Sequence, residues 1–103
     1  MVSPTQLSLK LLRNNGYLAD VVERYNSFSR KRHDLYGIFD IVACRTGEIA
    51  FIQTTTASNV SARIHKIEDH PDIDIIRKSG ATLLVHGWRK LKGRWSVRVV
   101  DVS

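Results

Sequence analysis

Residues 37–56, GIFDIVACRTGEIAFIQTTT, decide the fold that we predict for this chain. Two apolar runs, 35–44 and 49–56, lie on either side of the turn sequence RTGE at 45–48. Apolar runs of strand length joined by a short glycine-containing turn are typical of an antiparallel β-hairpin. We therefore expect this hairpin at the centre of the protein.

Polar residues interrupt the apolar pattern of the hairpin at Asp40, Gln53 and Thr55. Centring the turn in RTGE places Asp40 opposite Gln53 and Ile38 opposite Thr55, because opposed residues of an antiparallel pair are equally far from the turn. Side chains two residues apart share a face of a strand. Asp40, Gln53 and Thr55 are thus predicted to project together.

Capping residues and the spacing of apolar residues predict the other elements. In chain order we expect a helix over 4–12, a strand over 17–25, a polar basic loop over 26–34, the hairpin, helical stretches over 60–67 and 71–76, and closing strands over 81–86 and 95–102. This order indicates an α+β fold with a mixed central sheet flanked by helices.

The composition restricts the class of protein. A chain of 103 residues has the length of one domain, which we place over residues 1–103. Hydrophobic residues make up 43% and charged residues 25% of the sequence, which excludes a disordered or fibrous protein. Lys and Arg total 16 against 10 Asp and Glu, so the formal net charge is +6. This excess favours a polyanionic partner.

The sequence also restricts the compartment. The lone cysteine, Cys44, forms no internal disulfide, and no stretch reaches the roughly 18 apolar residues of a membrane span. The first residues lack a signal-peptide pattern. We expect a cytoplasmic protein without a membrane partner. The four histidines share no ligand spacing, so zinc is not expected.

Asp40 lies between Phe39 and Ile41 in an apolar strand. A carboxylate there is costly unless it is paired or ligated. One explanation is a Mg²⁺ (or Mn²⁺) ion, which takes oxygen ligands and needs only one or two protein carboxylates, with Gln53 adding its side-chain carbonyl. The other is structural: an arginine or a backbone amide compensates Asp40, and Gln53 hydrogen-bonds to it. Asp34, which precedes this strand, is expected to end the polar loop in an Asx turn.

The aspartate of FDIVA (39–43), the sequence QTT (53–55) on the next strand and the helix after it resemble the signature of the PD-(D/E)XK nuclease superfamily. The likeness is greatest to the small archaeal-type Holliday junction resolvases and to VRR-NUC-like domains, and it covers most of the chain. It implies a restriction-endonuclease-like αβββαβ core.

The resemblance implies metal-binding roles for three residues. Asp40 matches the first acidic ligand of the family, and Gln53 matches the second acidic position, where glutamine is a recognised variant. Glu23 would replace a glutamate that resolvases often carry on the opening helix. Its alternative role is that of an exposed strand residue paired with Arg24.

Thr55 stands where the resemblance implies a catalytic lysine. In this superfamily the lysine can migrate to the following helix, so Lys66 or Arg63 would support the attacking water or the phosphate. Loss of the lysine leaves open a site that binds DNA but cuts it poorly.

Two basic runs flank this site and are expected to contact phosphates. Their candidate residues are Arg30, Lys31, Arg32, His33, Arg89, Lys90 and Lys92. Trp88 and Trp95 bracket the second run, and we assign them to core or dimer packing rather than to base stacking.

The sequence therefore predicts a Mg²⁺-dependent DNA endonuclease that acts on branched DNA such as a Holliday junction and, by resemblance to the resolvases, forms a homodimer. One alternative is a nucleic-acid-binding module that keeps the nuclease scaffold with weak or no activity. Another is a subunit that binds a protein partner through Trp88 and Trp95.

Overall fold

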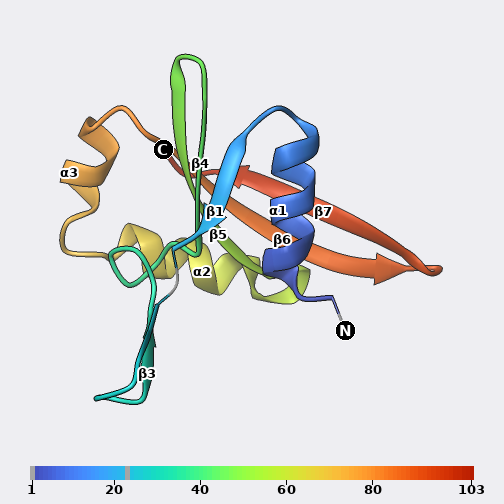
Figure 1. The fold of residues 1–103 in the computed structure, drawn as a ribbon, viewed down its shortest axis with the longest axis horizontal. Helices are drawn as coiled ribbons and strands as arrows, with labels where there is room; N and C mark the ends of the chain where they lie inside the picture. The colour runs from blue at the N-terminus through green and yellow to red at the C-terminus, as the bar shows by residue number, and fades with distance from the viewer. Residues whose placement is uncertain (1, 23) are drawn as a thin grey trace.

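The mixed sheet predicted around the hairpin is present in the computed structural model, which describes residues 2–22 and 24–103 (Figure 1). The elements in chain order are α1 (Pro4–Asn14), β1 (Leu18–Val21), β2 (Arg24–Asn26), β3 (Lys31–His33), β4 (Ile41–Arg45), β5 (Glu48–Thr56), the 3-10 turn η1 (Ala57–Asn59), α2 (Val60–Glu68), α3 (Ile73–Lys78), β6 (Thr82–Leu91) and β7 (Arg94–Asp101). Five strands form one sheet in the order β1-β4-β5-β6-β7. Neighbouring strands are antiparallel except for β5 and β6, which are parallel. The α+β fold class is confirmed.

Helices cover both faces of this sheet. α1 packs on one face over an apolar cluster of Leu9, Leu12, Ala19, Ile41, Ala43, Ala50 and Ile52. α2 and α3 contribute to the cluster on the other face, which contains Ile38, Phe39, Val60, Ile67, Ile73, Ile76, Ala81, Leu83, Val85 and Val102. The second half of β5 is buried because it is covered on both sides. None of the helices in the described residues is long and apolar enough to cross a membrane.

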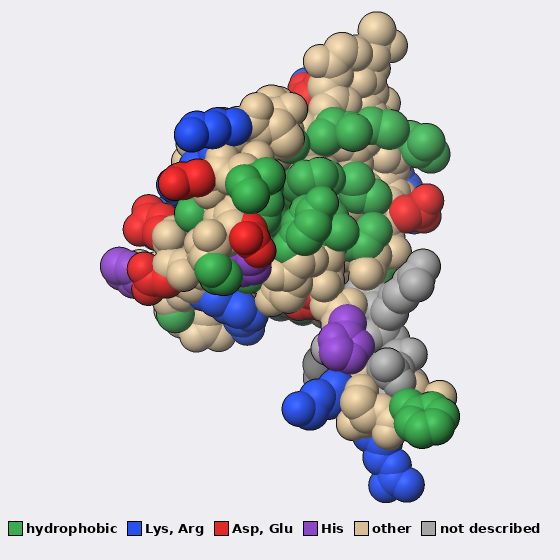
Figure 2. All heavy atoms as spheres, turned by 90° about the vertical axis from the view of Figure 1, so that its left-hand side faces the viewer, with side chains coloured by type: hydrophobic (Ala, Val, Ile, Leu, Met, Phe, Trp, Pro, Cys, Tyr) green, Lys and Arg blue, Asp and Glu red, His purple; other side chains and the backbone are tan. Residues whose placement is uncertain are grey.

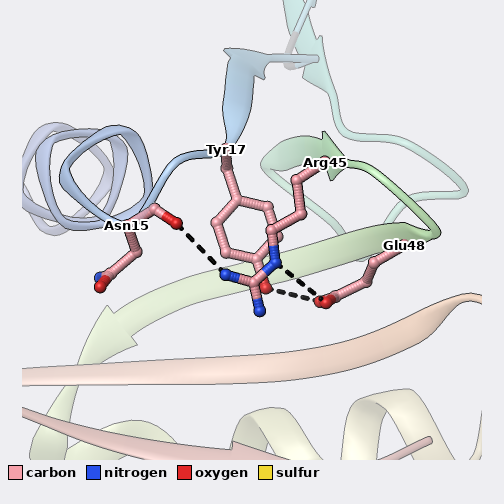
Figure 3. A network of polar contacts seen from close by, with 4 residues as sticks. All are labelled: Asn15, Tyr17, Arg45 and Glu48. Carbon is pink, nitrogen blue, oxygen red and sulfur yellow. Dashed lines mark hydrogen bonds and ion pairs between the residues drawn. The ribbon is translucent and has the colours of Figure 1, made fainter.

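A polar network ties the end of α1 to the turn between β4 and β5 (Figure 3). Arg45 donates to the Glu48 carboxylate and to the Asn15 carbonyl, each at 3.2 Å, and its guanidinium lies 4.2 Å from the centre of the Tyr17 ring. The Tyr17 hydroxyl donates to Glu48 at 2.5 Å. Burial and this hydrogen bond raise the pKa of Tyr17, and the same bond lowers the pKa of Glu48. The network fixes the predicted turn in place.

α2 begins close to β6 because residue 87 is a glycine. A Cβ atom on Gly87 would lie 2.2 Å from Cγ2 of Val60 and 3.2 Å from Cα of Ala57. No side chain fits between the strand and the start of α2 without moving them apart.

The hairpin register agrees with the prediction, since Arg45 pairs with Glu48. The first strand is shorter than predicted, however, because β4 begins only at Ile41. The predicted pairing of Ile38 with Thr55 is therefore wrong, because Ile38 lies in a turn before the strand.

Residues 35–39 form this tight turn. Leu35 and Phe39 exchange backbone hydrogen bonds of 2.9 and 3.0 Å. Between them, Tyr36 and Gly37 adopt positive φ angles of 55° and 74°, which reverse the chain and end any extended run.

Two further strand predictions are wrong in their extent. The strand expected over 17–25 is divided between β1 and β2, which belong to different sheets, and the loop expected over 26–34 contains β3. β2, the turn 27–30 and β3 form a two-stranded arm that extends below the main sheet in Figure 1. Of the two closing strands, β6 is longer than expected, because it continues to Leu91 and pairs there with Arg94, whereas β7 has the expected length and begins one residue earlier.

Candidate functional site

Asp40 lies at a bend immediately before β4, and neighbouring segments hold its backbone on both sides. Its N–H donates to the carbonyl of Ile52 at 2.9 Å, and its carbonyl accepts from the N–H of Val22 at 2.9 Å. Only 8% of Asp40 is exposed. The carboxylate is thus fixed in a buried position where β4 begins.

Three donors converge on Oδ2 of Asp40. They are the backbone N–H of Thr54 at 2.8 Å, the Thr54 hydroxyl at 3.0 Å and Nε2 of Gln53 at 2.9 Å. Because the Thr54 hydroxyl gives its proton to Asp40, the Thr5 hydroxyl, 2.8 Å away on α1, donates to Thr54 in turn. These donors compensate the buried charge. None of these three hydrogen bonds involves Oδ1 of Asp40.

Gln53 contacts this carboxylate through its amide nitrogen and leaves its amide oxygen unpaired. Its Nε2 donates to Asp40 and also to the carbonyl of Thr54 at 3.2 Å, so two acceptors fix the orientation of the amide. Its Oε1 is buried and has no hydrogen-bond partner among the described residues. An unsatisfied buried carbonyl costs about 1–3 kcal/mol. A water molecule, a cation or a substrate donor would recover that cost.

Asp34 is the residue that the sequence pattern did not assign to the site. Burial raises the pKa of its carboxyl group, and the charge of Asp40, to which it also hydrogen-bonds, raises this pKa further. Lys66 and Arg63 on α2 lower the same pKa. A pair of interacting carboxyl groups with cations beside them is the kind of arrangement that concentrates at functional sites.

The oxygen cluster, by which we mean Asp34, Asp40 and Gln53, is the part of the site with the chemistry to hold a cation. Within residues 2–22 and 24–103, no group of three or more His, Cys, Asp and Glu side chains is placed to hold a metal ion. The candidate ligands at this position are therefore the two carboxyl groups and the amide oxygen of Gln53.

The hydroxyl that reaches Asp40 belongs to Thr54, whereas the sequence pattern pointed to Thr55. Thr55 is buried and pairs with Gly87 of β6. Side chains 53 and 54 point to opposite faces of β5, because side chains alternate along a strand. In a regular antiparallel pair, one side chain of the neighbouring strand could therefore not contact both. Asp40 contacts both because it lies at the bend, outside the strand.

The predicted site residues thus have different outcomes. Asp40 and Gln53 are in direct contact, and Lys66 and Arg63 lie near enough to Asp34 to affect its pKa. Glu23 lies outside the described residues.

The predicted phosphate-binding residues lie on two hairpins that extend in different directions (Figure 1). Arg30, Lys31 and His33 are exposed on the arm, whereas the side chain of Arg32 lies outside the described part of the chain. Arg89, Lys90 and Lys92 are exposed around the turn between β6 and β7.

A second polar cluster connects α1 with β6. Nε1 of Trp88 donates to Oγ of Ser8 at 2.8 Å, and the Ser8 hydroxyl lies 2.9 Å from Nδ1 of His86. Burial lowers the pKa of His86 to about 4, so the ring that shares a hydrogen bond with the Ser8 hydroxyl is neutral. All three residues are buried, which makes this cluster a structural contact and not a nucleophile open to substrate.

No family model, no curated protein and no solved structure matches this chain at a significant level. The interpretation of the site therefore rests on its geometry and on the resemblance described above.

Proposed function

We propose that this protein is a Mg²⁺- or Mn²⁺-dependent endonuclease that hydrolyses phosphodiester bonds in DNA. The observation that carries the proposal is the unpaired, buried Oε1 of Gln53, on the same amide that donates to the Asp40 carboxylate, with Asp34 hydrogen-bonded to Asp40. A divalent cation would satisfy this oxygen and would also offset the repulsion between the two carboxyl groups.

The donor set fits a hard divalent cation. Asp34, Asp40 and Gln53 offer oxygen atoms, which Mg²⁺ prefers, and a Mg²⁺ site needs only one or two protein carboxylates. When bound, such an ion supplies Lewis acidity and lowers the pKa of a coordinated water.

The surrounding side chains have separate tasks in this proposal. Thr54 holds the Asp40 carboxylate through two hydrogen bonds, so its orientation is set before substrate arrives. Lys66 and Arg63 would attract the phosphodiester and stabilise the negative charge that develops on it. They would replace the lysine that the resemblance implies at Thr55.

The order of elements supports the same proposal. α1 is followed by three antiparallel strands of the large sheet, β1, β4 and β5, and helices then lead to β6, which is parallel to β5. The resemblance to the PD-(D/E)XK nucleases implies this αβββαβ order. β2, β3 and β7 would be additions to that core.

The alternative is a nucleic-acid-binding module that keeps the nuclease scaffold with weak or no activity. Thr55 at the lysine position favours it. This alternative expects DNA binding that divalent metal leaves unchanged.

Cleavage assays separate the two functions. Purified protein is mixed with labelled duplex, single-stranded and four-way-junction DNA in Mg²⁺ or Mn²⁺, and in EDTA. We expect metal-dependent cleavage that is lost in Asp40→Asn and kept in Asp20→Asn, which makes the same chemical change at an exposed carboxylate. No cleavage of any DNA, or undiminished cleavage by Asp40→Asn, would contradict the catalytic proposal.

We also propose a homodimer, which would present two sites to the two strands of a branched DNA. Its support is an apolar face formed by Leu18, Tyr36, Ile49, Phe51 and Ile75. Leu18 and Ile75 are 71% and 72% exposed, and Figure 2 shows hydrophobic side chains gathered on this side of the molecule. Exposed apolar patches of this kind mark protein interfaces. A cytoplasmic location stays a prediction of the sequence.

A further inference from the structure

Trp95 on β7 lies between two adjoining surface grooves. One groove, of about 730 Å³, runs along α1 and includes Gln6, Lys10 and Arg13 in its walls. The other, of about 580 Å³, lies beside the end of β5. Trp95 lines both, and we call the two grooves together the Trp95 groove.

The indole of Trp95 is available to a ligand. Trp95 is 42% exposed, whereas Trp88 is 7% exposed and uses its N–H to bind Ser8. Lys90 pairs with Trp95 across β6 and β7, and its Nζ lies 5.5 Å from the centre of the ring. A half-exposed aromatic ring with a cation beside it is suited to a base and its phosphate. Core packing is therefore wrong for Trp95 and agrees with the burial of Trp88, whereas dimer packing stays a prediction.

The charge of the Trp95 groove points to an anionic ligand. Its walls contain the cations Lys10, Arg13, Arg89 and Lys90, and the residues that line it in the described chain include no aspartate or glutamate. Asp20 forms an ion pair with Arg13 at 3.5 Å, so the attraction for an anion comes mainly from Lys10, Arg89 and Lys90. The pocket at the apolar face differs, since Asp72 forms part of its wall.

We propose that the Trp95 groove binds single-stranded nucleic acid, with a base stacked on Trp95 and the phosphates near Lys10, Arg89 and Lys90. A single strand suits this surface better than a duplex, because the faces of bases in a duplex are already stacked on their neighbours. The groove shares no lining residue with the oxygen cluster. It adds to the proposed function a substrate with an unpaired segment, and binding there does not require cleavage.

Tryptophan fluorescence tests the proposal directly. The full chain is titrated with a short oligothymidylate in EDTA, so that cleavage plays no part in the result. We expect strong quenching of wild-type fluorescence and much weaker quenching in Trp95→Phe, whose remaining emission comes from Trp88, which also lines the groove but is only 7% exposed. Trp95→Phe still stacks, so anisotropy with labelled oligothymidylate should show nearly unchanged affinity. Trp95→Ala should bind roughly 5- to 100-fold more weakly.

Salt dependence gives a second measurement that does not rely on a tryptophan variant. Contact with three phosphates predicts a slope of about −2 for log affinity against log salt on a single strand. Lys10→Ala and Lys90→Ala should each reduce its magnitude by about 0.7, whereas Lys78→Ala on α3 should leave it unchanged. Asp40→Asn should bind the oligonucleotide as the wild type does.

Three results would overturn the proposal. They are tighter binding of duplex than of single strand by this groove, affinity that Trp95→Ala and Lys10→Ala leave unchanged, and quenching as strong in Trp95→Phe as in the wild type. Failure of this site would leave metal-dependent cleavage at Asp40 untouched, and loss of cleavage in Asp40→Asn would leave this binding untouched. The two proposals can therefore fail separately.

Discussion

Thr5 and Ser8, which lie one turn apart on α1, meet Thr54 and His86, which are paired on neighbouring strands. The first contact continues to the Asp40 carboxylate. α1 is therefore held on the sheet by two polar contacts as well as by apolar packing. One of these contacts also sets the position of the candidate catalytic aspartate.

The neutral state of His86 makes stability depend on pH. Burial lowers its pKa to about 4, while a histidine in the unfolded chain has a pKa of about 6.5. Between these values the unfolded chain binds a proton that the folded chain does not, so stability rises with pH. We therefore expect the titration of His86 to lower the free energy of unfolding by about 3 kcal/mol as the pH falls from 7 to 4.

Urea titrations across this pH range check the prediction in the wild type and in His86→Asn. Asparagine keeps an acceptor for Ser8 but does not titrate, so the variant should lose this part of the pH dependence. Equal changes of stability in both proteins would show that His86 is not the cause.

Single residues of the candidate site were predictable only where strand geometry applies. The strand register was enough to predict that Asp40 lies opposite Gln53, and the structure confirms their contact. Asp34 was not assigned because it precedes a turn in which Tyr36 has a positive φ angle. Such an angle is uncommon for a tyrosine and cannot be predicted from the residue pattern. Thr54 was missed because alternation places it on the wrong face.

At the scale of elements, the arm was missed for a physical reason. β2 and β3 pair Arg24 with His33, Tyr25 with Arg32 and Asn26 with Lys31. Tyr25 is the one aromatic residue in these six, which is too little for the apolar alternation by which strands are recognised. The hairpin β4–β5 was predicted correctly because one of its faces packs against α1, and the residues on that face are apolar. The fold of the sheet was therefore more predictable than the fold of the arm.

The arm should contribute to DNA affinity through charge alone. Arg30→Ala and Lys31→Ala are each expected to reduce the magnitude of the salt slope on duplex DNA by about 0.9, which corresponds to one lost phosphate contact. Lys78→Ala, an exposed lysine on α3, is the control for the loss of one positive charge. Fluorescence anisotropy with labelled duplex over a range of salt measures these slopes. Slopes equal to that of the wild type would remove the arm from the binding surface.

The contact between α2 and β6 can be tested at Gly87. Gly87→Ala is expected to lower the free energy of unfolding by about 1–3 kcal/mol, because the new Cβ would overlap Val60. Val60→Ala removes the overlapping methyl group. The double variant should therefore lose less stability than the sum of the two single variants in urea unfolding. Strictly additive losses would mean that this contact does not limit residue 87.

At the scale of the whole molecule, the two basic hairpins and the apolar face occupy different parts of the surface. The basic residues of the arm and of the β6–β7 turn lie on projecting hairpins, and the apolar face lies on the side shown in Figure 2. This separation would let two copies meet through one surface while the basic hairpins remain open to DNA.

Sedimentation velocity tests the proposed dimer. Ile49→Arg on the apolar face should convert a dimer to a monomer, because it places a charge in the interface. Val99→Arg is the matched control: Val99 is also 49% exposed, and its strand, β7, lies at the other edge of the sheet from β1. A monomeric wild type, or a dimer that Ile49→Arg leaves intact, would contradict this assignment.

We propose that the oxygen cluster of Asp34, Asp40 and Gln53 holds a divalent cation, and calorimetric titration with Mn²⁺ measures this binding without any need for cleavage. We expect a single bound ion per wild-type chain and the same binding in Asp20→Asn. Asp40→Asn, shown to be folded by circular dichroism, should bind Mn²⁺ more weakly by about tenfold or more. Absence of binding by the wild type, or equal binding by Asp40→Asn, would contradict the proposal.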